Sequence, residues 1–397
     1  MLFLFLLLLS FPVFGQNQNE DSIDSILSKI YAERDSFYAD SFYEETLEKA
    51  YHAYLEKDFK RAIQKLDLIY SKYKDRDWRY YSIRGKVHEA KEEEDEAIYH
   101  FTFSIALNPA QPEIFKKLYE LNFKIRRPVK SFDYIRLYLK ENENDIQMRY
   151  RALILAKRLG NDEYVRYSLK KIQNLTPKEL DINQINKEIS DLISKNKIKE
   201  AKIEVNQYLP HFPINEELHS NLYIILRKLK VKDREIESAL MDSAVLLSEN
   251  TKYPLRLAMF YKERKRYLQA LDLFRRIFYT TLSKQGFEMD TEIILFLKEC
   301  YSELNQSNDV RATLSLMEIF SKKEKPEFGE WNSLRINFQN NREFLVSLLY
   351  YTKSNQMNVQ YDSIKSILVD RDNKKADSER MNIYSVFTYD DFRNQIP

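Results

Sequence analysis

His88 and Glu92 are two residues whose types and spacing could bind a metal ion. On a helix they would lie one turn apart on the same face, with an imidazole beside a carboxylate. Tight zinc sites use three or four protein ligands, and a lone pair of this kind is a weak signal. We therefore expect no metal site here, and we interpret His88 as a surface or interhelix histidine.

Covalent chemistry would have to involve Cys300, which is the chain's single cysteine. A thiol nucleophile needs a neighbouring base, and no histidine lies near Cys300 in the sequence. The chain also lacks a glycine-rich phosphate loop and the G-x-S-x-G and H-E-x-x-H motifs. We expect Cys300 to be a packing residue, no cofactor to be bound, and the chain not to be an enzyme. A catalytic pocket would require residues that are distant in the sequence.

Charge is balanced over the whole chain but not along it. The 63 basic and 61 acidic residues give a net charge of +2, which predicts binding to neither nucleic acid nor an anionic membrane. The acidic run 92–96 is interpreted as a solvated turn, with binding of a cation or a basic partner as the alternative. Between residues 113 and 171 basic side chains clearly outnumber acidic ones.

Small residues followed by a proline recur about every 34 residues, which is a repeat length typical of helical hairpins. The clearest copy covers residues 78–111, with Gly85 in a first helix, Ala97 and Phe101 in a second, and Pro109 at the end. Small residues let two helices approach closely, and proline stops a helix because it lacks a backbone donor. The 28 tyrosines and 24 phenylalanines would fill the space between helices, with an aromatic binding surface as the alternative.

These repeats resemble the tetratricopeptide repeat family. The resemblance implies an all-α fold, a right-handed superhelical solenoid of antiparallel helix hairpins with about eight or nine repeats. We expect the parts of the chain to be a signal peptide (1–15), an N-terminal amphipathic helix (16–42), repeats one to five (43–214), an irregular helical repeat (215–250), further repeats (251–356), and a capping helix with a C-terminal tail (357–397). Residues 283–286 are expected to form an extended loop.

The two ends of the chain have their own patterns. Residues 2–9 form an unbroken apolar run, and the polar stretch 16–19 follows, as in a cleaved secretory signal. An uncleaved anchor and a buried core segment are the alternatives, because no Lys or Arg precedes the apolar run. Residues 381–389 are aromatic and strand-prone, and they would fold back on the last helices, remain disordered, or dock on a partner.

In the tetratricopeptide family, the first helix of each repeat lines a concave groove. Carried onto this sequence, that position implies a partner-binding groove that mixes basic and aromatic side chains, namely Arg79, Lys86, Lys116, Phe123, Lys124, Tyr150, Lys157 and Arg158. Such a groove suits an acidic, partly apolar peptide, although ordinary solvated lysines would give the same pattern. The Lys/Asn clamp with which some family members grip chaperone C-termini is replaced here by Ser82, Lys86 and Glu89.

The sequence therefore predicts a non-catalytic scaffold that binds a partner protein or peptide outside the cytoplasm, with the periplasm as the expected compartment. The alternative is a structural subunit of an envelope or appendage assembly that associates with itself through its ends. Neither the oligomeric state nor the partner follows from the sequence.

Overall fold

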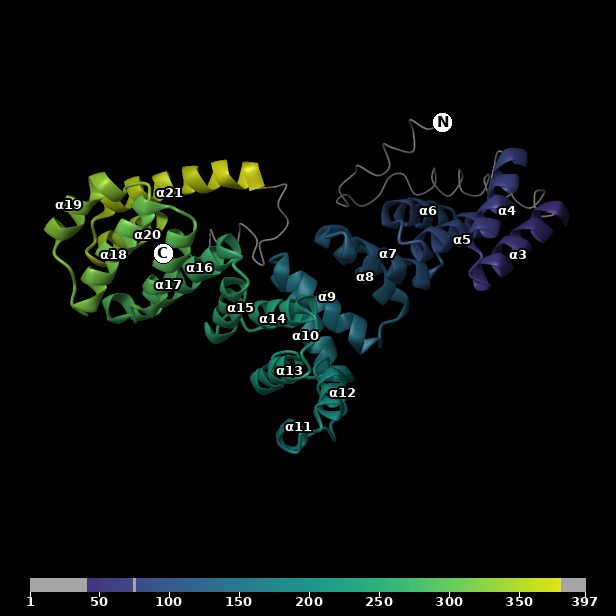
Figure 1. Ribbon diagram of the computed structural model, residues 1–397, viewed down its shortest axis with the longest axis horizontal. Helices are drawn as coiled ribbons and strands as arrows, with labels where there is room; N and C mark the ends of the chain where they lie inside the picture. The colour runs from purple at the N-terminus through teal and green to yellow at the C-terminus, as the bar shows by residue number, and fades with distance from the viewer. Residues whose placement is uncertain (1–40, 74–75, 380–397) are drawn as a thin grey trace. The chain divides into compact units, whose positions relative to one another are not determined.

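The computed structural model describes residues 41–73 and 76–379, with side chains described as far as residue 370 (Figure 1). Every regular element in these residues is a helix, which confirms the predicted all-α fold of repeated hairpins. The expected signal peptide (1–15), almost all of the expected amphipathic helix (16–42) and the aromatic tail lie outside the described residues. Among the helices described, none has the length and hydropathy to cross a membrane.

The chain separates into two compact units, of which the first ends at Ile114. Its helices are α3 (Ser41–Leu55), α4 (Phe59–Lys72), α5 (Trp78–Ala90) and α6 (Glu94–Leu107). Asp58 and Asp77 begin α4 and α5 as N-caps, because each carboxylate accepts a hydrogen bond from a backbone amide in the first turn.

Small residues lie where the helices of the first unit touch, as the repeat pattern predicts. Ala50 and Ala62 are fully buried in one core cluster with Leu66 and Val87. Gly85 on α5 faces Phe101 on α6 so closely that an added Cβ would lie 2.6 Å from the ring carbons. A glycine is therefore required here by close packing and not by its backbone angles.

The second unit begins at Phe115, inside the helix that follows α6. Its hairpins are α7 (Pro112–Lys124) with α8 (Pro128–Glu141), α9 (Ile146–Arg158) with α10 (Asp162–Leu175), α11 (Ile182–Ser194) with α12 (Ile198–Tyr208), α13 (Glu216–Lys228) with α14 (Asp233–Leu246), α15 (Lys252–Glu263) with α16 (Tyr267–Gln285), α17 (Glu292–Glu303) with α18 (Ser307–Ser321), and α19 (Phe328–Phe338) with α20 (Arg342–Ser354). A last helix, α21 (Asn358–Glu379), follows. Residues 215–250, whose register the sequence leaves unclear, form one more hairpin, and the described helices make nine hairpins in all.

Most hairpin turns contain one residue in the left-handed backbone region. These residues are Lys57, Glu92, Arg126, Gly160, Asn196, Lys230, Lys265 and Asn305. A left-handed residue ends a helix by reversing the chain, which is usually the task of glycine. The acidic run 92–96 spans one such turn, and Glu94, Asp95 and Glu96 lie in the first turn of α6, where carboxylates favour a helix N-terminus.

Two helix contacts in the second unit each skip at least one whole hairpin. Helix α9 packs against α14 as well as α10, and α16 packs against α20 as well as its neighbours (Figure 1). The expected extended loop at 283–286 is wrong, because the chain remains helical to Gln285 and Gly286 begins a short 3-10 turn. Helix α16 is therefore unusually long. The apolar residues Ile277, Phe278 and Leu282 continue the buried face of α16 almost to its end.

Candidate functional site

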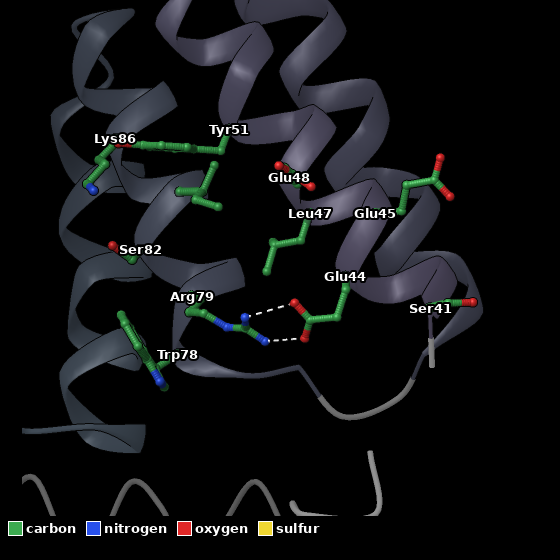
Figure 2. A pocket seen from close by; sticks show the side chains of 11 residues that line it. Ser41, Glu44, Glu45, Leu47, Glu48, Tyr51, Trp78, Arg79, Ser82 and Lys86 are labelled. Atoms are coloured by element: carbon green, nitrogen blue, oxygen red, sulfur yellow. Dashed lines mark hydrogen bonds and ion pairs between the residues drawn. The ribbon is translucent and has the colours of Figure 1, made fainter. Parts of the chain in front are cut away.

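A pocket of about 630 Å³ lies between α3 and α5, the first helices of the first two hairpins (Figure 2). Both walls come from side chains at helical spacing. Glu44, Leu47, Glu48 and Tyr51 recur along one face of α3. The complete lining is Ser41, Glu44, Glu45, Leu47, Glu48, Tyr51, Trp78, Arg79, Ser82, Ile83 and Lys86.

The floor of the pocket is apolar and its walls are charged. Leu47 and Ile83 are 4% and 8% exposed, so they belong to the core and leave only an edge in the pocket. The rings of Tyr51 and Trp78 add apolar surface at opposite ends of the pocket, and Tyr51 is more than one third exposed (Figure 2). An apolar floor with a few polar groups around it is the usual composition of a ligand pocket.

Arg79 and Glu44 join the two walls at one end of the pocket (Figure 2). Arg79 donates two parallel hydrogen bonds to the Glu44 carboxylate, with N–O distances of 2.9 and 2.5 Å. Its Nε donates a third bond to Asp77, at 2.8 Å. Burial works against the charged guanidinium, but these carboxylates outweigh it and raise the pKa of Arg79 above its ordinary value. Arg79 is therefore permanently charged and already engaged.

The opposite end of the pocket is formed by Tyr51 and Lys86. The Lys86 ammonium lies 5.6 Å from the centre of the Tyr51 ring, within the range of a cation–π contact. Between the two ends lies Glu48, whose nearest ionic neighbour is the imidazole of His52 at 3.7 Å. Glu45 pairs with Lys49 on the same helix, and this hydrogen bond lowers the pKa of its carboxyl group.

The eight residues that the sequence predicts for the groove fall in both units. Arg79 and Lys86 line the α3–α5 pocket of the first unit. The other six belong to α7 and α9 in the second unit, and their exposure differs. On α7, the Lys116 ammonium lies 5.9 Å from the centre of the Tyr138 ring, Phe123 is 40% exposed beside Tyr119, and Lys124 is exposed. On α9, Tyr150 is 5% exposed, and Lys157 and Arg158 are partly buried.

Tyr150 and Arg158 are engaged inside the second unit. The Tyr150 ring belongs to the hydrophobic core shared with α13, α14 and α15, so little of it is open to a partner. Burial lowers the pKa of Arg158, while the charge of Asp242 on α14 acts in the opposite direction. Asp242 also lies 3.6 Å from Arg151 on α9, so this region holds α9 against α14. Phe123 and Lys124 are exposed, and Lys116 and Lys157 are partly exposed.

Sequence reasoning missed one wall of the pocket. It predicted the helix hairpins of this region but gave no role to Glu44, Glu48 or Tyr51. The signal was present as a spacing of four and then three residues on the face beside the buried Leu47 and Ala50. The opposite wall comes from α5, on which the sequence reasoning had selected Arg79 and Lys86.

The residues that suggested chemistry have structural roles. His88 places Nδ1 2.6 Å from the Glu93 carboxylate, and its ring stacks on His100 of the neighbouring helix at 5.2 Å between centroids. Cys300 is fully buried, and burial raises the pKa of its thiol to about 11. In the part of the chain that the structure describes, no three His, Cys, Asp or Glu side chains are arranged to hold a metal ion.

The hairpins define a class of protein. First helices begin at Ser41, Trp78, Pro112, Ile146, Ile182 and Glu216, so one repeat follows another at about the 34-residue interval of the tetratricopeptide repeat. Polar contacts recur at the same interval, as between Glu44 and Arg79 and between Glu216 and Asn250. The chain is thus a helical-repeat protein with hairpins of the tetratricopeptide type.

Comparison with known proteins gives matches only among solved structures. No family model matches the chain, and no curated protein matches it. A tetratricopeptide repeat protein from Parabacteroides merdae is 14% identical over 66% of this chain and 99% of its own, with a TM-score of 0.34. The TPR2AB domain of yeast Sti1, solved in a complex with pHSP90, is 15% identical over 71% of this chain and 99% of its own, with a TM-score of 0.24.

A third solved structure is Naa15/Naa10 bound to HypK-THB, which is 11% identical with a TM-score of 0.33. It matches 90% of this chain, while this chain covers 64% of that one. The assignment of the fold rests on the helix pairs described above.

Proposed function

We propose that this protein is a non-catalytic scaffold that binds a peptide segment of a partner protein in the α3–α5 pocket. The observation that carries the proposal is the pocket itself, which is open between two first helices and combines an apolar floor with charged walls. Such a surface can hold an extended chain by packing one side chain and pairing another.

The chemistry of the described residues supports binding in preference to catalysis. Cys300 is a poor nucleophile because its thiol is fully buried and its pKa is raised. Burial, with the charges of Arg84 and His88 adding to it, lowers the pKa of His100 to about 3. Within the pocket, both oxygens of the Glu44 carboxylate accept hydrogen bonds from Arg79.

A second contact with an acidic part of the same partner is proposed for the second unit. Lys116, Phe123 and Lys124 lie on α7 and Lys157 lies on α9; Phe123 and Lys124 are exposed, and Lys116 and Lys157 are partly exposed. Basic side chains around an aromatic ring suit an acidic segment with an apolar residue. Arg158 would contribute its charge from a partly buried position.

We also propose that the scaffold acts outside the cytoplasm, with the periplasm as its compartment. The support comes from the sequence, where the apolar run 2–9 is followed by an abrupt polar stretch. Secretion or an outer-surface location and an uncleaved N-terminal anchor remain the alternatives.

The fully buried Cys300 makes a site-specific cross-linking test simple. A cysteine introduced as Glu48→Cys would be the accessible thiol, and it can carry a benzophenone photo-cross-linker into the pocket. The matched control is Glu56→Cys at the exposed turn after α3, outside the pocket lining. A partner that cross-links from position 48 and not from position 56 supports the proposal. Equal capture from both positions, or from neither, contradicts it.

Exposed apolar residues near the end of the described chain favour a second candidate function, a self-associating structural subunit. Ile336 on α19 is 76% exposed and Val359 on α21 is 80% exposed. Light scattering of the full chain separates the two functions. A concentration-dependent oligomer that Ile336→Asp with Val359→Asp returns to a monomer would favour the subunit.

A further inference from the structure

The α3–α5 pocket contains more carboxylates than cations. Glu44, Glu45 and Glu48 come from α3, whereas Arg79 and Lys86 come from α5. The buried Asp77 adds a further carboxylate beside Arg79. A charged ligand therefore meets an acidic wall, although the chain as a whole has a net charge of +2.

Glu44 occupies the position that a ligand carboxylate would take on Arg79. Its two oxygens bind the guanidinium in the bidentate arrangement that is the strongest geometry for an arginine and a carboxylate. Figure 2 shows Glu44 reaching across the pocket to Arg79, whereas Glu45 points away from α5. An acidic ligand would have to displace Glu44 and would leave that carboxylate unpaired beside Asp77.

Glu48 is positioned to receive a cation. Its side chain is 72% exposed, and its neighbour His52 pairs with it only when the imidazole is protonated. The apolar edges of Leu47 and Ile83 lie on the floor of the same pocket. A lysine or arginine can pack its methylene chain on such a floor while its charged end stays at the solvent-exposed carboxylate.

We propose that the α3–α5 pocket binds a peptide segment with a lysine or arginine next to a large apolar residue, and that Glu44 excludes acidic segments by holding Arg79. This inference rests on the proposed function, because it assigns the ligand of the same pocket. Glu48 pairs with the basic side chain, and the Tyr51 ring contacts the apolar one. The acidic segment proposed for the second unit is a separate part of the partner.

Three fluorescein-labelled peptides of equal length test this specificity on the full chain. They alternate leucine with lysine, with glutamate or with glutamine, and binding is measured by fluorescence anisotropy. We expect the lysine peptide to bind at least about fivefold more tightly than the glutamate peptide. The net positive charge of the chain would favour the opposite order, so this preference has to come from the local site.

Three variants assign the effect to residues. Glu48→Gln is expected to weaken the lysine peptide about threefold, a typical effect for an exposed ion pair. Glu44→Gln replaces the carboxylate on Arg79 with a neutral amide while the bond to Asp77 stays, and it is expected to tighten the glutamate peptide by a similar factor. Glu56→Gln, at an exposed position outside the pocket, is expected to change the affinity of neither the lysine peptide nor the glutamate peptide. Circular dichroism of each variant establishes that it remains folded.

The outcomes separate this inference from the proposed function. Tighter binding of the glutamate peptide that persists after Lys124→Glu with Lys157→Glu removes the basic contact proposed for the second unit would overturn the specificity while leaving a peptide-binding pocket in place. Unchanged preferences in Glu44→Gln and Glu48→Gln would overturn it as well. In that case Tyr51→Ala would still weaken every peptide. If none of the three peptides binds, and the cross-linker at position 48 captures nothing, the proposed function itself is wrong.

Discussion

Arg275 on α16 and Glu343 on α20 form an ion pair in the interior of the second unit, although 68 residues separate them in the sequence. The Arg275 Nε donates to the carboxylate at 2.6 Å, and the hydroxyl of Tyr301 on α17 donates to its other oxygen at 2.5 Å. The Glu343 side chain has no exposed surface and that of Arg275 is 16% exposed. Three helices from different hairpins are thus joined by one buried polar network.

Removing the carboxylate with Glu343→Ala should destabilise the second unit strongly. The change removes the buried counter-ion of Arg275 and leaves it the more exposed Asp272 carboxylate, 3.7 Å away. Breaking a buried ion pair by removing one partner typically costs about 3–5 kcal/mol. Urea unfolding followed by circular dichroism measures the loss. Glu200→Ala is the control, because Glu200 pairs with Lys197 at the surface and its loss should cost less than about 1 kcal/mol. Equal effects of the two variants would show that the buried network does not stabilise the fold.

Acid should weaken the same network. Burial raises the pKa of Glu343, but the charge of Arg275 and the Tyr301 hydrogen bond prevail and hold it below its usual range. A glutamate whose pKa is lower in the folded state stabilises the protein at a pH above its pKa in the unfolded chain, which is about 4.3. This stabilisation disappears as the pH falls through the pKa of the folded state. We expect the wild type to lose stability below about pH 4 and Glu343→Gln to lose less over that range.

Gly85→Ala should destabilise the first unit even though alanine favours helices. The new Cβ would lie 2.6 Å from the Phe101 ring, and such overpacking typically costs about 1–3 kcal/mol. The double variant Gly85→Ala with Phe101→Leu gives the methyl group room. Its unfolding free energy should exceed the value expected from adding the two single effects. Additive effects would mean that the two positions do not contact each other.

His219 should make the stability of the second unit depend on pH near neutrality. Its imidazole is 1% exposed and lies between Ser243 and the Pro213 carbonyl, and burial lowers its pKa to about 4. The pKa of a histidine in the unfolded chain is about 6.5, so below this pH the unfolded chain binds the proton more readily than the folded chain does. The free energy of unfolding therefore falls as the pH falls towards 4. Between pH 7 and pH 5 the loss should be about 2 kcal/mol. His219→Gln should flatten this dependence in urea titrations, whatever its effect at pH 7.

Lys124→Glu with Lys157→Glu should weaken binding of the partner without unfolding the second unit. Lys124 is exposed on α7 and Lys157 is partly exposed on α9, so reversing their charges disturbs little packing. The partner identified by cross-linking provides the probe, and its affinity is compared at low and high salt. Unchanged affinity with an unchanged salt dependence would remove these basic residues from the binding surface.

The repeat architecture could be predicted because it depends on local signals. Gly85, Ala97 and Phe101 mark a helix pair at a spacing that the sequence displays directly. The contacts between distant helices could not be predicted in the same way. Nothing in the sequence around Arg275 or Glu343 indicates that α16 contacts α20. The apolar face of α16 continues almost to Gln285, but the end of this helix was predicted to be a loop.

The binding surface could be predicted only in part, for a similar reason. Two of the residues that the family position selects, Arg79 and Lys86, line the α3–α5 pocket, and their role in binding a partner stays a prediction. The same rule selected Tyr150, whose ring is buried because α9 also packs against α14. A periodic rule describes what each hairpin does to its neighbour, and it fails where a helix has a second neighbour.

The contacts that skip helices also determine how the second unit should respond to mechanical force. A row of hairpins that touch only adjacent hairpins would open one at a time when its ends are pulled, with many small extensions. Here the pairing of α9 with α14, and of α16 with α20, encloses the hairpins between them. These segments should resist until the enclosing contact breaks and then extend together. The force trace of this chain is therefore expected to show few large steps, with the enclosed hairpins released as blocks.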